Sequence, residues 1–241
     1  MQAYHTAHGV RILDYLDLHY YPQASNVSLN DAVDSGIQAL RLRSTRSLWD
    51  STYTDESWIG EPVRLIPRMR EWVNANYPGT LLAITEYNWG APNHINGALA
   101  QADVLGIFGR ERLDMATLWS PPESTQPLAF AFRMYRNYDG LGHTFGDTSG
   151  QAISANQDKV SIYAARRSSD NALTLMIINK SSISQLVNLS LTGFTPTGSA
   201  QVYRYSAENL SAIQHLASLS FTGNSLNTSL PANSITLLVV P

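Results

Sequence analysis

Glu86 stands at the end of a strongly apolar run, among side chains that can bind or react. The run 81–84 contains no polar residue, and residues 87–89 supply a phenol, an amide and an indole. Burying an unpaired carboxylate is costly, so a glutamate in this setting needs a partner or a function. The carboxyl end of a parallel strand is where α/β barrels carry catalytic groups. Two interpretations stay open: Glu86 is a reactive carboxylate, or a structural one paired with Arg41 or Arg43.

Aromatic and polar side chains also follow the other apolar runs of the first half. Aromatic rings stack on the apolar faces of sugar rings, while amides, hydroxyls and carboxylates bind sugar hydroxyls. A carboxylate among such groups can attack an anomeric carbon. A core position fits the histidine and the three tryptophans of this set equally well. The predicted substrate-binding residues are His19, Tyr20, Trp49, Tyr87, Trp89 and Trp119.

Alternating strand and helix patterns would position these residues. Apolar runs predict strands over 12–21, 39–48, 81–86 and 113–119. Apolar residues at helical spacing predict helices over 28–40, 67–77, 98–108 and 126–138. This order indicates a parallel sheet and an α/β architecture, in which the ends of the strands share one edge.

The second half of the chain has a different pattern. A stretch rich in Gly, Asp and Ser covers 139–157, and only short β-rich runs follow it. The predicted strands are 160–165, 173–179, 186–191, 200–205, 219–222 and 235–240. Their spacing is typical of an antiparallel β-sandwich. We therefore predict an α/β domain over 1–145 and a β-sandwich over 150–241.

The composition excludes several classes of protein. The 241 residues include 16 basic and 19 acidic side chains, for a net charge of −3, which argues against nucleic-acid binding. There is no cysteine, and no apolar run is long enough to span a membrane. The N-terminal residues lack the pattern of a signal peptide and predict instead a helix closed by Gly9.

No metal or cofactor is expected. The six histidines show no metal-ligand spacing. Asp139, Asp147 and Asp158 could in principle ligate calcium, but the loop lacks an EF-hand pattern.

Four segments, taken together, resemble glycoside hydrolase family 44, which comprises endo-β-1,4-glucanases and xyloglucanases. These segments are 13–23, 55–73, 77–90 and 113–122. The resemblance implies a (β/α)8 barrel with an attached β-sandwich. It also implies retaining hydrolysis of β-1,4-glucans, and secretion of the full-length enzyme to which the chain would belong. It identifies Glu86 as the catalytic nucleophile on the seventh barrel strand, and places His19 to Pro22 on the fifth strand.

The chain departs from the family pattern at one catalytic residue. The family's acid/base glutamate lies in an Asn-Glu-Pro type motif, and this sequence contains no Asn-Glu dipeptide. We therefore expect the chain to cover about strands five to eight of the barrel, and to lack the acid/base residue. An open half-barrel edge would also favour self-association, with two halves closing one barrel.

Two alternatives to a hydrolase remain. The first is an inactive carbohydrate-binding remnant, which keeps the aromatic side chains but has lost the acid/base. The second is a sandwich that binds glucan by itself. The second half contains no tryptophan, so its strands are better explained by packing against the barrel. The expected partner is a β-glucan polysaccharide or oligosaccharide, with no nucleic acid and no membrane.

Overall fold

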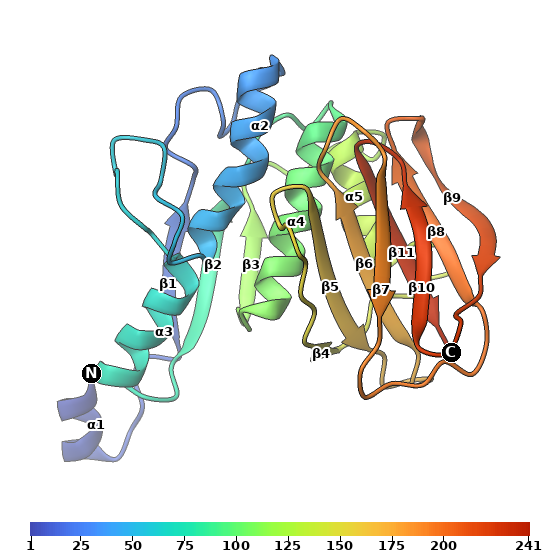
Figure 1. Cartoon of the computed structure of the whole chain (residues 1–241). Helices are drawn as coiled ribbons and strands as arrows, with labels where there is room; N and C mark the ends of the chain where they lie inside the picture. The colour runs from blue at the N-terminus through green and yellow to red at the C-terminus, as the bar shows by residue number, and fades with distance from the viewer.

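The computed structural model describes residues 1–241, and it divides into a parallel α/β part followed by antiparallel sheets (Figure 1). The α/β elements are α1 (Gln2–His8), β1 (Tyr15–Tyr20), α2 (Ser35–Arg43), the 3-10 helix η1 (Ser44–Leu48), α3 (Leu65–Asn76), β2 (Leu81–Tyr87), α4 (Ile95–Arg110), β3 (Met115–Leu118) and α5 (Pro127–Arg136). Gly9 closes α1 in the left-handed conformation, as expected.

A three-stranded parallel sheet with the order β1-β2-β3 carries the site. The register between β1 and β2 shifts by one residue after Leu18. Leu18 is opposite Ile84, and His19 is then opposite Glu86 rather than Thr85. This irregularity places the side chains at the ends of the two strands next to each other.

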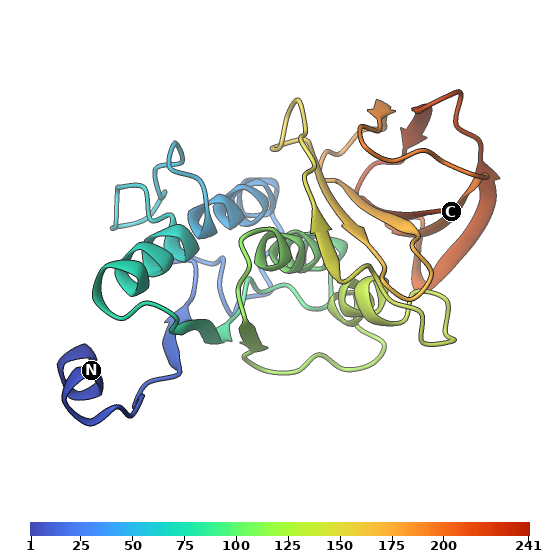
Figure 2. The same ribbon diagram turned by 90° about the horizontal axis from the view of Figure 1, so that it is seen from below.

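Helices cover one face of this sheet and leave the other open. Figure 2 shows α2, α3 and α4 on the same side of the three strands. On the opposite face the alternate residues Tyr15, Leu81 and Met115 are each about two-fifths exposed, at 39%, 39% and 41%. A parallel sheet is ordinarily covered on both faces, so this exposed face is unusual.

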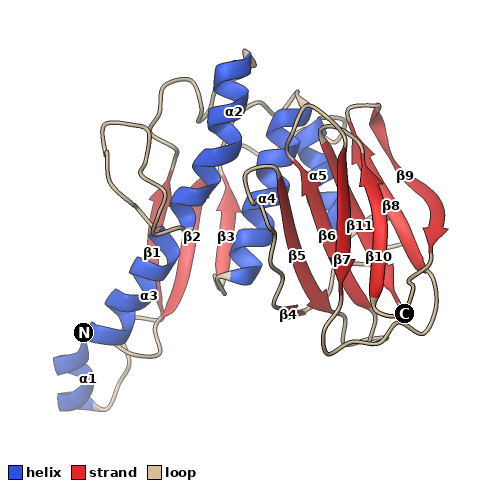
Figure 3. Cartoon of the chain, in the orientation of Figure 1, coloured by secondary structure: helices blue, strands red, loops and turns tan.

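Helix α4 is buried because it packs between β2 and the antiparallel sheet, and α5 packs against α4 and the same antiparallel sheet (Figure 3). Nearly all of α4 is inaccessible to solvent, from Ile95 to Phe108. A single core of 34 buried residues joins the parallel sheet, these helices and one face of the antiparallel sheet. The α/β part and the antiparallel part therefore share their main hydrophobic core.

The antiparallel part contains β4 (Thr148–Gly150), β5 (Val160–Arg166), β6 (Leu173–Asn179), β7 (Gln185–Ser190), β8 (Ala200–Ser206), β9 (Asn209–Leu219), β10 (Ser225–Leu230) and β11 (Ser234–Val240). Six of these strands form one sheet with the order β4-β5-β6-β11-β8-β9, and β10 and β7 form a second, two-stranded sheet. A smaller core of 9 buried residues fills the space between the two sheets. This is a sandwich, as the alternating pattern predicted.

Three local predictions were wrong. The strand expected over 39–48 is the end of α2 followed by η1, so the parallel sheet has three strands rather than four. Asp34 caps α2 by accepting a hydrogen bond from the backbone N–H of Ile37, at 3.0 Å. The cap starts a helix that continues through a segment whose apolar residues alternate like those of a strand.

The same cap explains why the helix predicted over 28–40 begins only at Ser35. In the sandwich, no strand covers 219–222: the long strand β9 ends at Leu219, and the next strand, β10, begins at Ser225.

No helix of the structure combines the length and the apolar character that crossing a membrane would require.

Candidate functional site

Glu86 lies at the carboxyl end of β2 and is held by two neighbouring polar groups. The Tyr21 hydroxyl donates a hydrogen bond to Glu86 Oε2 over 2.9 Å. The Nδ1 atom of His19 lies 3.2 Å from the same oxygen. Both contacts use Oε2, and Glu86 Oε1 has no hydrogen-bond partner in the protein. One carboxylate oxygen is thus fixed in place, while the other has no partner within the protein.

No arginine or lysine neutralises Glu86. Arg41 is fully buried but binds elsewhere: its Nε donates to the Trp89 carbonyl at 2.7 Å and its Nη1 to Asn96 Oδ1 at 2.8 Å. Arg43 pairs with Glu56 instead. The structural interpretation, in which one of these arginines holds Glu86, is therefore wrong.

Tyr21 is a site residue that the sequence reasoning did not single out. Burial, and then the hydrogen bond to Glu86, raise the pKa of Tyr21 to about 12. The phenol therefore stays protonated at neutral pH and acts as a permanent donor to the carboxylate. Three polar or aromatic residues in a row, 19–21, were the available signal; only the register of β1 decides which of them reach Glu86.

Trp119 follows β3 at the same edge of the sheet, and its side chain is 49% exposed. Its backbone N–H donates to the Tyr87 carbonyl at 3.0 Å, and its carbonyl accepts from Asn88 Nδ2 at 2.7 Å. These bonds tie the residue after β3 to the end of β2, close to Glu86. His19 is also accessible, with 52% of its side chain exposed.

The other four predicted substrate-binding residues lie in or against the main hydrophobic core. Tyr20, Tyr87 and Trp89 are buried at 7%, 1% and 1% exposure, so their rings offer no free face to a sugar. Trp49 follows η1 rather than a strand, and the Arg110 guanidinium lies 4.0 Å from its ring centroid. Packing explains these four aromatic residues, because they form core contacts.

A further exposed aromatic residue, Trp58, lies in the loop between η1 and α3. Its side chain is 82% exposed, and its indole N–H donates to Gln23 Oε1 at 3.3 Å. Gln23 in turn donates to the Tyr21 carbonyl at 2.8 Å. Trp58 is thus connected to the residue that holds Glu86. Sequence reasoning missed it because a tryptophan in a loop has no periodicity that marks its surroundings.

No second carboxylate contacts Glu86, Tyr21 Oη or His19 Nδ1. Asp17, also on β1, accepts two hydrogen bonds from Thr85. The backbone N–H of Thr85 donates to Oδ1 at 3.0 Å, and its hydroxyl donates to Oδ2 at 2.5 Å. No group of three or more His, Asp or Glu side chains is arranged to hold a metal ion. The chemistry available at this edge is that of one carboxylate, a phenol, an imidazole and exposed indoles.

Comparison with known proteins shows which enzymes this chain is similar to. No protein-family model matches the chain. The chain is 33% identical to endoglucanase A of Paenibacillus lautus over 241 residues, which is 96% of this chain and 34% of that protein. It thus spans about a third of the length of that curated relative.

Solved structures show the same relation. A bifunctional glucanase-xylanase from a metagenome library superposes with a TM-score of 0.96 at 51% identity, covering 99% of this chain and 46% of that one. A family 44 xyloglucanase of Paenibacillus polymyxa superposes with a TM-score of 0.92 at 31% identity, covering 100% of this chain and 49% of that one. The chain is therefore a relative of the glycoside hydrolase family 44 enzymes over its whole length, consistent with a C-terminal portion of such an enzyme.

Proposed function

We propose that this chain carries the nucleophile of a retaining endo-β-1,4-glucanase of the cellulose and xyloglucan type, with Glu86 in that role. The observation that supports this most directly is the environment of Glu86. It is an accessible carboxylate at a strand end with two polar partners on Oε2, no cationic arginine or lysine, and a free Oε1. A nucleophile needs this combination of fixed orientation and an unoccupied oxygen.

The proposed reaction has two steps. Oε1 of Glu86 attacks the anomeric carbon, the bond from that carbon to the leaving oxygen breaks, and a covalent glycosyl-enzyme forms. Water then attacks the anomeric carbon, gives its proton to the carboxylate that protonated the leaving oxygen in the first step, displaces Glu86 and restores the anomeric configuration. Tyr21 donates a hydrogen bond to Oε2 throughout, which keeps the carboxylate aligned.

The first step needs a proton for the leaving oxygen. Retaining enzymes supply it from a second carboxyl group about 5–5.5 Å from the nucleophile. We place that group in the part of family 44 enzymes that this chain does not span. In this proposal the three parallel strands belong to a (β/α)8 barrel, and its remaining strands cover the exposed face of the sheet.

Exposed aromatic rings at the same edge would bind the sugar chain. We assign Trp119 and Trp58 as stacking surfaces and His19 as a polar contact next to the reacting sugar, because all three side chains are accessible. The relatives' names include endoglucanase, xylanase and xyloglucanase activities, so a β-1,4-linked glycan is the substrate class that these surfaces fit.

Chemical rescue tests this proposal. In a full-length enzyme that contains this chain, Glu86→Ala should lose hydrolysis of an activated aryl cellobioside. Azide should restore aglycone release and yield a glycosyl azide with the inverted, α configuration, because azide takes the place of the missing carboxylate. Glu71→Ala serves as a control, since Glu71 is an exposed glutamate of α3 that pairs with Arg64 and contacts no residue of the site. Undiminished hydrolysis by Glu86→Ala would refute the assignment.

A carbohydrate-binding remnant is the second candidate, and one observation favours it. No second carboxylate contacts Glu86 in this chain. Assayed alone, the chain should then bind cellohexaose without releasing reducing sugar. Release of reducing ends by the chain alone would rule out this alternative.

A further inference from the structure

The loop that carries Trp58 has no secondary structure to hold it. It runs from Trp49 to Arg64, between η1 and α3. An indole that is 82% exposed makes few packing contacts of its own. The position of Trp58 therefore depends on the polar side chains that tie this loop to the rest of the molecule.

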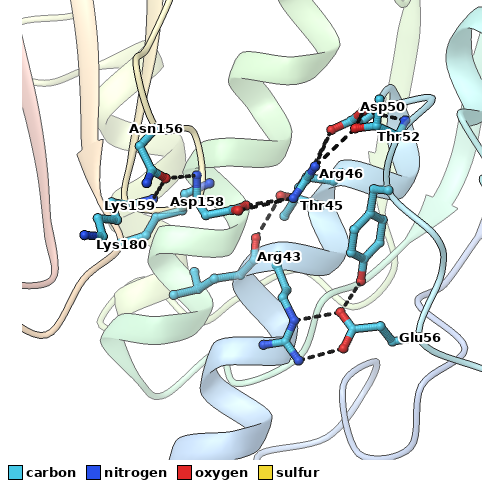
Figure 4. A network of polar contacts seen from close by, with 12 residues as sticks. Arg43, Thr45, Arg46, Asp50, Thr52, Glu56, Asn156, Asp158, Lys159 and Lys180 are labelled. Carbon is cyan, nitrogen blue, oxygen red and sulfur yellow. Dashed lines mark hydrogen bonds and ion pairs between the residues drawn. The ribbon is translucent and has the colours of Figure 1, made fainter.

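One tie joins the loop to α2. The Arg43 guanidinium binds Glu56 through two hydrogen bonds, from Nε to Oε1 at 2.6 Å and from Nη2 to Oε2 at 2.7 Å (Figure 4). The Tyr53 hydroxyl donates to Oε1 of the same carboxylate at 2.8 Å. A two-point contact between arginine and carboxylate fixes orientation as well as distance. It holds the backbone two residues before Trp58.

A second tie reaches the loop from the sandwich. Arg46 on η1 donates from Nε to Asp50 Oδ2 at 2.8 Å and from Nη1 to both oxygens of Asp158 at 3.1 and 3.2 Å. Its guanidinium also lies 5.2 Å from the ring centroid of Tyr53, whose hydroxyl binds Glu56. Figure 4 shows each arginine with its partners, Arg43 with Glu56 and Arg46 with Asp50 and Asp158.

The sandwich residue in this network is itself held in place. Asn156 Oδ1 accepts hydrogen bonds from the backbone N–H groups of Asp158 and Lys159, at 3.1 and 3.2 Å. This arrangement fixes the turn that presents the Asp158 carboxylate. The network therefore runs continuously from a rigid turn before β5 to the loop that carries Trp58.

We propose that Arg43, Arg46 and Asp158 form a brace that positions Trp58 for stacking on a β-glucan chain. The sandwich then contributes to substrate binding without touching the substrate. The three brace residues act as positioning residues through Glu56 and Tyr53. The inference rests on the proposed function, because it requires that Trp58 binds the glycan.

Calorimetric titration of this chain with cellohexaose tests the brace. Trp58→Ala should weaken binding by roughly threefold to tenfold, as expected for the loss of one stacking ring. Arg43→Ala should weaken binding by a similar or smaller factor, and the double variant should be no weaker than Trp58→Ala alone. Arg43→Lys should restore only part of the affinity, because an ammonium cannot form the two-point contact.

The sandwich arm of the brace has a matched control. Asp158→Asn should weaken cellohexaose binding about twofold, since an exposed ion pair makes a small contribution. Asp170→Asn provides the comparison. Asp170 pairs with Arg167, outside the brace, and its side chain is 48% exposed, against 54% for Asp158. Asp170→Asn should leave the affinity unchanged.

Each result has one interpretation. If Trp58→Ala weakens binding but neither Arg43→Ala nor Asp158→Asn does, the brace is refuted and the proposed function stands. If Trp58→Ala has no effect, or if the wild type does not bind cellohexaose, both the stacking role of Trp58 and the brace are refuted. The role of Glu86 as nucleophile is then still tested separately, by the azide experiment. Additive losses in the double variant would also refute the brace. If Arg43→Ala fails to fold, Tyr53→Phe provides the test instead.

Discussion

Glu86 and Asp103 are two carboxylates of the α/β part with opposite surroundings. Asp103, on α4, is completely buried: the Thr45 hydroxyl and the Tyr163 hydroxyl each donate to it at 2.7 Å, and Lys180 Nζ lies 3.2 Å away. Glu86 is partly exposed, has polar partners on one oxygen only and lacks a cation from lysine or arginine. The first carboxylate is saturated and the second is left available.

The difference matches a structural role for Asp103 and the chemical role that we propose for Glu86. A buried carboxylate is tolerated only when charge and hydrogen bonds compensate for the loss of water. Asp103 meets that condition, and Tyr163 and Lys180 come from the sandwich, so it joins the two parts of the molecule. Glu86 keeps an oxygen free at the cost of partial exposure, which suits a group that must form a bond to substrate.

The largest expected effect is on turnover at Glu86. Glu86→Gln in a full-length enzyme should lower turnover of xyloglucan by on the order of 10³-fold or more, because the amide cannot form the covalent intermediate. The free energy of unfolding should change by less than about 1 kcal/mol, because the contacts that change are partly exposed to solvent and the amide still accepts a hydrogen bond. Reducing-sugar assays and urea unfolding measure the two quantities. A large loss of stability would place Glu86 with Asp103 as a structural group.

The next effect is on stability at Asp103. Asp103→Ala should lower the free energy of unfolding by about 3–5 kcal/mol, because it leaves the Lys180 ammonium buried without a counter-charge. Urea unfolding monitored by tryptophan fluorescence measures this change. The double variant Asp103→Leu with Lys180→Met should be more stable than Asp103→Ala, since it buries no charge. If the double variant is the less stable of the two, the pair contributes more than charge compensation.

Adjacent tyrosines provide a finer comparison. Tyr21→Phe removes the hydrogen bond to Glu86 and should lower turnover by about tenfold, as expected for a hydrogen bond to a charged group, with little change in stability. Tyr20→Phe removes a buried phenol that lies 3.5 Å from Asp55, and should affect stability more than turnover. Rates and urea midpoints for both variants test this separation. Equal losses of turnover in Tyr20→Phe and Tyr21→Phe would contradict the assignment of Tyr21 as the tyrosine that supports Glu86.

The smallest effect is on the pH dependence of stability. Burial alone would raise the pKa of Asp103, but Lys180 and the donated hydroxyl groups outweigh it and hold that pKa below its ordinary value. A carboxyl whose pKa is lowered by folding stabilises the protein above its unfolded pKa of about 3.9, and that contribution is lost as the pH falls below this value. The difference in unfolding free energy between wild type and Asp103→Asn should stay constant from about pH 5 to 8 and narrow below pH 4. Urea midpoints at several pH values measure it, and a difference that widens on acidification would contradict the assigned direction.

Much of the architecture could be predicted from the residue pattern. The runs at 81–86, 160–165 and 173–179 are strands, and the segment predicted to be helical at 98–108 lies within α4. These predictions succeeded because the segments are rich in apolar residues and are mostly buried in the folded chain. The segment 39–48 failed because the cap at Asp34 starts a helix outside the window, and the apolar alternation does not detect it.

The site was only partly predictable, for a different reason. Glu86 was identified because an isolated carboxylate after an apolar run is a local signal. Tyr20, Tyr87 and Trp89 were grouped with the substrate-binding residues because they lie at the ends of predicted strands, yet all three are buried. Burial depends on which face of the strand packs against α4, and the sequence around a single strand does not specify that face.

The sequence by itself determined the chemistry that was available: one isolated carboxylate, a cluster of aromatic residues, and two successive folding patterns. The tertiary structure decided which of these groups meet. A one-residue shift in the register of β1 brings His19 opposite Glu86, and Tyr21 bonds to the same carboxylate oxygen. The arginines of α2 are directed to carbonyl groups and to Glu56, away from that carboxylate. Contacts of this kind join residues about 65 positions apart along the chain, so they are a property of the packed structure and not of any local pattern.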